Sequence, residues 1–188
     1  MRRLLLLGLI SAAPATAAPA SPDWPCMQRL VPTLTAATLW SGPAPEQDWR
    51  ADPAIAALVD QIASRRTKLD DAVERLQRFV ATDPAIERRA EVFAGLVERS
   101  NAERTQAIDR LRGVARRLHA LAEAVGTITS ELNDLPADTP PSARADVASH
   151  RSLMIREYED LGRTVRYACE IPVAFETRLG RFGQILGP

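Results

Sequence analysis

PAIERRAEVFAGLVERSNAERTQAIDRLRGVARRLHALAEAVGTITSELNDL, residues 84–135, is the stretch that decides the fold. Its apolar residues recur at intervals of three and four, which is the spacing of one face of a helix. They are Ile86, Ala90, Phe93, Val97, Ile108, Leu111, Ala115, Leu118, Ala122, Val125 and Leu132. Polar residues interrupt the stripe near Ser100 and Asn101. The pattern predicts one long helix, which would span roughly 78 Å at 1.5 Å per residue.

A second helix is predicted to turn back along the first. Residues 136–141, PADTPP, cannot continue a helix and are typical of a tight turn. The three-and-four rhythm then resumes from residue 142 to about residue 171, including Val147, Met154 and Val165. If the two helices are antiparallel, Cys169 lies opposite about Ile108. Pro172 predicts either a kink or the start of a new short helix before Phe175, Leu179, Phe182 and Ile185.

Two short helices are expected before the long one. Asp52-Pro53 and Asp83-Pro84 are helix-start signals, because the carboxylate can accept from free first-turn amides and proline tolerates the first helical position. Thr67 and Asp70 resemble a capping box, so helices are predicted at about 53–65 and 67–81, the alternative being one helix with a kink near Arg66. The fold class is therefore all-α: a long antiparallel hairpin (about 84–135 and 142–171), with short helices forming a small bundle at one end.

The first residues have the layout of a secretory signal. Arg2 and Arg3 precede a short leucine-rich run, and small residues follow it, with cleavage expected after Ala17 or Ala20. We therefore expect residues 1–20 to be removed and the chain to be periplasmic or secreted. No later stretch is long and apolar enough to cross a bilayer. Residues 52–188 would then form one helical domain.

The segment at residues 21–51 is predicted to be an extended arm, because its five prolines rule out a long helix. It also contains Trp24, Trp40 and Trp49, all the tryptophans of the chain. These side chains are either an interaction platform for a ligand or partner, or the anchors that hold the arm to the helices.

Cys26 and Cys169 are the only cysteines. In an oxidising compartment such a pair is best explained by one structural disulfide, although a buried thiol pair or pairing between two chains is compatible with the sequence. Neither cysteine belongs to a CxxC or haem-attachment motif, so neither redox catalysis nor bound haem is predicted.

Charge argues against a nucleic-acid partner. Removal of Arg2 and Arg3 leaves 22 basic residues against 24 acidic ones, a formal charge of about −2. Acidic residues Glu157, Glu159 and Asp160 would face Arg110, Arg112, Arg116 and Arg117 across the hairpin. We interpret them as ion pairs on a solvated face, the alternative being an acid/base pair in a cleft.

Metal binding has one candidate set. His150 and Met154 lie four residues apart on one helix face, and His119 is expected near the same level of the hairpin, a combination that suits copper. A metal site needs three or four ligands, and these side chains supply three at most, so no cofactor is predicted. No phosphate-binding loop, nucleophile elbow or zinc-protease helix occurs, and no catalytic residue is assigned.

Three segments carry a resemblance: Asp23–Arg29 (DWPCMQR), Asn101–Arg104 (NAER) and Cys169–Pro172 (CEIP). The chain resembles small exported all-helical proteins of Gram-negative bacteria that carry no assigned activity. The resemblance implies neither a substrate nor a catalytic residue.

The sequence favours a non-enzymatic periplasmic binding or scaffold protein that acts through a coiled-coil-like hairpin on an envelope protein or assembly. One alternative is a chaperone-like protein that holds unfolded clients, and another is a copper-handling protein. Self-association into a homodimer is a further expectation.

Overall fold

The structure is a computed structural model that describes residues 23–83 and 85–187. The predicted signal segment, residues 1–20, and Pro84 lie outside the described residues.

The described residues are helical and contain no strand, which confirms the all-α fold. A 3₁₀ turn and five α-helices follow in order: η1 (Ala36–Thr38), α1 (Pro53–Ile62), α2 (Leu69–Thr82), α3 (Ile86–Asp134), α4 (Pro141–Ala168) and α5 (Glu170–Leu186). Helix α3 has 49 residues, about 73 Å of rise at 1.5 Å per residue. None of these helices has the length and apolar character that a membrane span requires.

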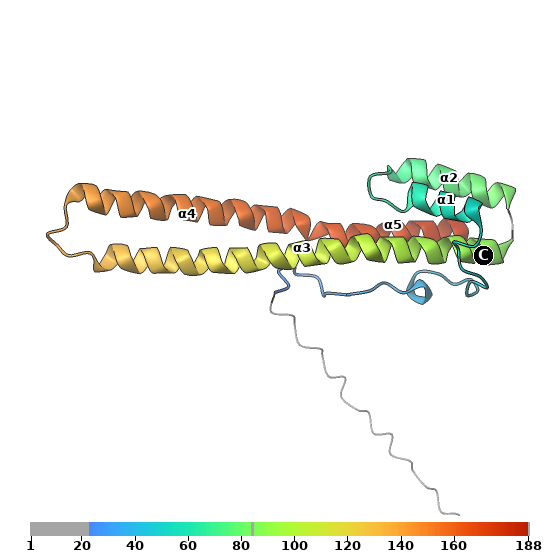
Figure 1. The fold of residues 1–188 in the computed structure, drawn as a ribbon, viewed down its shortest axis with the longest axis horizontal. Helices are drawn as coiled ribbons and strands as arrows, with labels where there is room; N and C mark the ends of the chain where they lie inside the picture. The colour runs from blue at the N-terminus through green and yellow to red at the C-terminus, as the bar shows by residue number, and fades with distance from the viewer. Residues whose placement is uncertain (1–22, 84, 188) are drawn as a thin grey trace, which may run out of the picture.

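The long hairpin has the predicted antiparallel form (Figure 1). Helix α4 returns along the second half of α3, and α5 continues along its first half. Arg117 Nη2 donates to Glu157 Oε1 over 2.5 Å, and Arg151 Nε donates to Thr129 Oγ1 over 2.8 Å. These bonds set the register close to the predicted one. The apolar stripe shifts near the tip, where Ile128 is buried and Ala122 is exposed.

The core lies at the end of the molecule away from the hairpin tip. Helices α1 and α2 pack over α3 and α5 there, and the arm runs along the other side of α3 (Figure 1). One apolar cluster joins the arm, α1, α2, α3 and α5. It consists of Leu34, Trp49, Ile55, Val59, Ile62, Ala63, Ala72, Leu76, Val92, Phe93, Leu96, Val97, Leu179, Phe182 and Leu186. The small bundle predicted at one end is therefore the core of the fold.

Only one of the predicted helix starts has the expected geometry. The Asp52 carboxylate accepts from the amides of Ala54 and Ile55, at 2.7 and 3.3 Å. It also accepts from Arg88 over 2.8 Å, and this guanidinium, together with the two amides, holds the pKa of Asp52 below its usual value.

The other two start predictions were wrong. Helix α3 begins at Ile86 after Ala85, and Asp83 pairs with Arg88 instead of capping the helix. At α2 the N-cap is Lys68, and the Thr67 hydroxyl donates to the Gln61 carbonyl at 2.8 Å. In both places the side chain that would cap the next helix instead bonds another group within six residues of it in the sequence.

Pro172 determines where the returning helix breaks. A proline has no amide hydrogen to donate to the carbonyl four residues earlier, and its ring crowds that carbonyl. For Pro172 that carbonyl belongs to Ala168, the last residue of α4. The bend therefore falls at Cys169, three residues before the proline, and α5 begins at Glu170 as a new helix.

Candidate functional site

The candidate site is an apolar groove of about 750 Å³ beside the bend between α4 and α5. We call it the disulfide-side groove, because Cys26 and Cys169 form part of its wall. Its lining comes from the arm, the α1–α2 connection, the start of α2 and the two helices at the bend: Pro25, Cys26, Met27, Gln28, Arg65, Leu69, Val165, Arg166, Cys169, Glu170, Val173, Ala174, Thr177 and Arg178.

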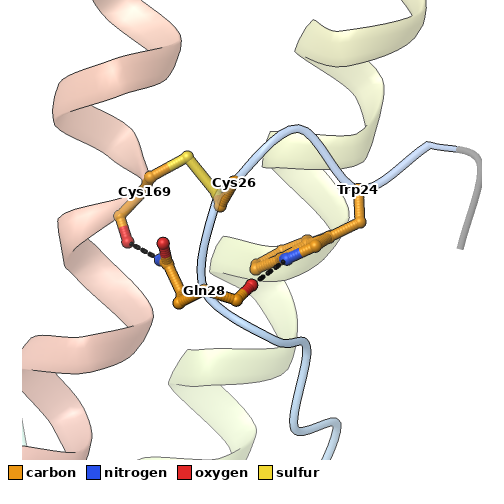
Figure 2. The surroundings of a disulfide bond; sticks show 4 residues. All are labelled: Trp24, Cys26, Gln28 and Cys169. Atoms are coloured by element: carbon orange, nitrogen blue, oxygen red, sulfur yellow. Dashed lines mark hydrogen bonds between the residues drawn. A yellow bond between two sulfur atoms is a disulfide. The ribbon is translucent and has the colours of Figure 1, made fainter. Parts of the chain in front are cut away.

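A disulfide fixes the arm at this groove. Cys26 and Cys169 are bonded, with their Cα atoms 5.6 Å apart, which confirms the predicted pairing within one chain. Figure 2 shows how Gln28 reinforces the link: its side-chain amide donates to the Cys169 carbonyl over 2.5 Å. The indole of Trp24 donates in turn to the Gln28 carbonyl over 2.7 Å. The disulfide and these two hydrogen bonds therefore hold residues 24–28 in place as one wall of the groove.

Polar side chains of α3 hold the next part of the arm. Asn101 accepts from the Leu34 amide over 2.9 Å and donates to the Leu34 carbonyl over 2.8 Å. A residue on a neighbouring β-strand would form the same pair of hydrogen bonds. Arg104 is 2% exposed. Its guanidinium donates to the carbonyls of Val31 and Pro32, and it pairs with Glu176 of α5 over 2.9 Å. The polar interruption of the apolar stripe is thus the docking point of the arm.

Three apolar side chains stand open to solvent around the groove. Met27 is fully exposed, and Val173 and Leu69 are exposed over 42% and 39% of their surfaces. They come from the arm, α5 and α2, respectively. Isolated exposed apolar residues are common, but several around one hollow mark a binding surface.

The groove also carries an excess of positive charge. Arg65, Arg166 and Arg178 line it, against Glu170 as the one acidic lining residue. None of these arginines forms a salt bridge with a carboxylate of residues 23–83 or 85–187. An apolar surface bordered by unpaired guanidinium groups suits a ligand that is both apolar and anionic.

Arg178 is the most buried of the three, at 8% exposure. Its Nη2 donates to the Ile62 carbonyl over 2.9 Å, and its guanidinium lies 5.1 Å from the Phe182 ring centroid. Its Nε is buried and has no hydrogen-bond partner among the described residues. Burial lowers the pKa of Arg178, yet a guanidinium stays charged at neutral pH. The carbonyl, the ring and the nearby Glu103 carboxylate together compensate this charge only in part.

The three tryptophans lie along the arm at different depths. Trp49 is 4% exposed and its indole donates to Glu98 over 3.1 Å. Trp40 stacks on Phe93 with ring centroids 5.2 Å apart. Trp24 is half-buried beside the disulfide. These positions are those of anchors, and none of the three lines the disulfide-side groove.

The candidate metal ligands are not brought together. His119 lies two residues from Arg117, which pairs with Glu157, whereas His150 lies beside Arg151, which bonds Thr129. The histidines therefore differ by about eight residues in level, roughly 12 Å along the hairpin, so the expectation that they share a level was wrong. Both histidines are exposed, Met154 is half-buried, and no metal-binding group of three His, Cys, Asp or Glu residues occurs within the described chain.

The acidic and basic clusters of the hairpin form exposed ion pairs. Arg117–Glu157 crosses the hairpin, Arg116 reaches Asp23 of the arm over 3.2 Å, and Arg163 pairs with Asp160 along α4. At least half of each arginine side chain is exposed in these pairs, so each contributes little to stability.

Sequence reasoning missed the disulfide-side groove, because no linear pattern links its four contributing segments. Arg104 had a detectable signal. It continues the stripe of Val97 and Ile108 at helical spacing, and a charged residue at an inward position implies a buried partner.

No protein-family model, curated protein or solved structure matches this chain. The fold and the site define an all-α protein with a projecting hairpin and an apolar groove bordered by arginines, held by one disulfide.

Proposed function

We propose that this chain is a non-enzymatic binding protein of the bacterial periplasm or the extracellular space, which presents its hairpin to a protein of the cell envelope. The disulfide supports an oxidising compartment, and the predicted signal segment would export the chain to one.

One observation carries the proposal. We call residues 112–164 the distal hairpin, and within it only Ala115 and Ile128 are buried. The core cluster draws on none of these residues. A long segment that buries almost no apolar surface contributes little to the stability of the fold. Its elongated form instead carries a binding surface away from the core.

The outward side of α4 offers contact points along this segment and just beyond it. Leu153 and Tyr167 are exposed over 58% and 73% of their surfaces, and two helical residues fourteen apart lie on nearly the same face. Aromatic and aliphatic side chains of this kind act as anchors in protein interfaces.

Site-specific photo-crosslinking in living cells tests the proposal. A crosslinking residue at Leu153 or Tyr167 should yield an adduct with the same envelope protein, whereas one at the exposed Gln77 of α2 should not. A variant lacking residues 112–125 and 151–164 shortens both helices by about 21 Å and keeps the tip, and it should lose the adduct from Tyr167. If the hairpin positions yield no more adduct than Gln77 in the exported, folded protein, the proposal fails.

A further inference from the structure

We propose that the disulfide-side groove binds a medium-chain fatty acid, with the carboxylate at the guanidinium groups of Arg65 and Arg178 and the hydrocarbon chain along Val173 toward the disulfide. No residue of the distal hairpin lines this groove. The proposal is therefore independent of the hairpin function, and the two can fail separately.

The shape and apolar lining suit a single hydrocarbon chain. A volume of about 750 Å³ lies within the range of small-molecule sites, roughly 300–1,000 Å³. Val173 and Ala174 lie on α5 between Cys169 and Arg178, and Leu69 adds an apolar side chain from the start of α2. Met27 adds an unbranched, adaptable side chain at the disulfide end.

Two of the three arginines that line the groove lie at one end. Arg178 donates to the carbonyl of Ile62, and Arg65 follows Ile62 by three residues, with its guanidinium 5.6 Å from the Phe175 ring centroid. Both side chains therefore reach the groove near the α1–α2 connection. Arg166 and Glu170 lie at the other end, near the disulfide, and their opposite charges largely offset each other. One anionic head and one apolar tail match this distribution.

The burial of Arg178 favours the end of a flexible chain over a partner helix. At 8% exposure its guanidinium lies within the fold, and a carboxylate must enter between α5 and the α1–α2 connection to approach it. A fatty-acid head can do so, whereas a carboxylate on a docked helix stays at the surface. Ion pairing in such a desolvated place is stronger than at an exposed site.

Calorimetric titration of the oxidised protein with octanoate, decanoate and dodecanoate tests the proposal. The affinity should rise by about fourfold for each added methylene, because each one buries apolar surface. Dodecanol, which has the same chain without the charge, should bind about tenfold more weakly or worse than dodecanoate. Absence of saturable binding, or equal affinity for the acid and the alcohol, would overturn the proposal.

Two variants and a matched control locate the site. Arg65→Gln should weaken dodecanoate about tenfold and leave dodecanol nearly unchanged. Val173→Asp places a carboxylate in the path of the chain and should weaken both ligands. Arg66→Gln, the neighbouring arginine outside this groove, should bind as the unchanged protein does. Equal losses in the Arg65 and Arg66 variants would contradict the assignment. Arg178 is left intact because it bonds the end of α1.

Discussion

Gly95 is a residue at which α3 lies very close to both the arm and α1. A Cβ atom built there would lie 2.8 Å from Trp49 Cδ2 and 2.9 Å from Val59 Cγ2, distances that real Cβ contacts do not show. Gly113, in the same helix, has no such neighbour within 4 Å. The structure assigns close packing to Gly95, with the indole of Trp49 as the neighbour.

Gly113→Ala should therefore stabilise the fold, whereas Gly95→Ala should leave its stability unchanged or lower it. Both gain about 1 kcal/mol of helix propensity, so the difference between them isolates the steric conflict at Gly95, which we expect to be about 1–3 kcal/mol. Urea unfolding followed by circular dichroism measures both. If the two variants were equally stable, Trp49 would not be packed against α3 as described.

At the scale of elements, a capping signal succeeds where the carboxylate stays free to reach the first-turn amides. Asp52 caps α1 as predicted, because its carboxylate reaches the first-turn amides and Arg88 can bond it at the same time. Asp83 does not cap α3, because Arg88 binds its carboxylate in another direction. Pro172 stops α4 through backbone chemistry alone, so the sequence predicted a break here, although not that Cys169 would be its first residue.

The disulfide between the arm and the bend should stabilise the fold strongly. Cys26 and Cys169 are 143 residues apart, and closing so large a loop contributes up to about 5 kcal/mol on the chain-entropy model. Replacing both cysteines by serine should lower the free energy of unfolding toward that amount and loosen the arm before residue 31. Asn101 and Arg104 would still hold the segment that follows.

Limited trypsin digestion tests whether the loosening is confined to the arm before residue 31. Arg29 is exposed in the loosened part, whereas Arg50 is exposed but pairs with Glu98. Cleavage after Arg29 should accelerate relative to cleavage after Arg50 in the double-serine variant. A parallel rise at both sites would mean that the disulfide stabilises the whole fold without fixing the arm.

At the scale of the whole molecule, the residues that form the core and the residues that form the distal hairpin are separate sets. The shortened hairpin lacking residues 112–125 and 151–164 loses one buried residue, Ala115. We expect its thermal midpoint to stay within a few degrees of that of the full chain, since the core cluster is unchanged. Differential scanning calorimetry measures this. A large drop would mean that the distal hairpin is part of the folding unit and would remove the argument that it serves binding.

The sequence by itself determined the helical hairpin, the turn at residues 136–141 and the break before Pro172. These features follow from periodicity and backbone chemistry, which act over a few residues. For the two cysteines the sequence favoured one disulfide, and the structure decided that they pair within the chain. Tertiary structure alone decided the arm's contacts with Asn101 and Arg104, the level of each histidine and the disulfide-side groove. The groove combines side chains from four segments, and their distances depend on packing that no local pattern encodes.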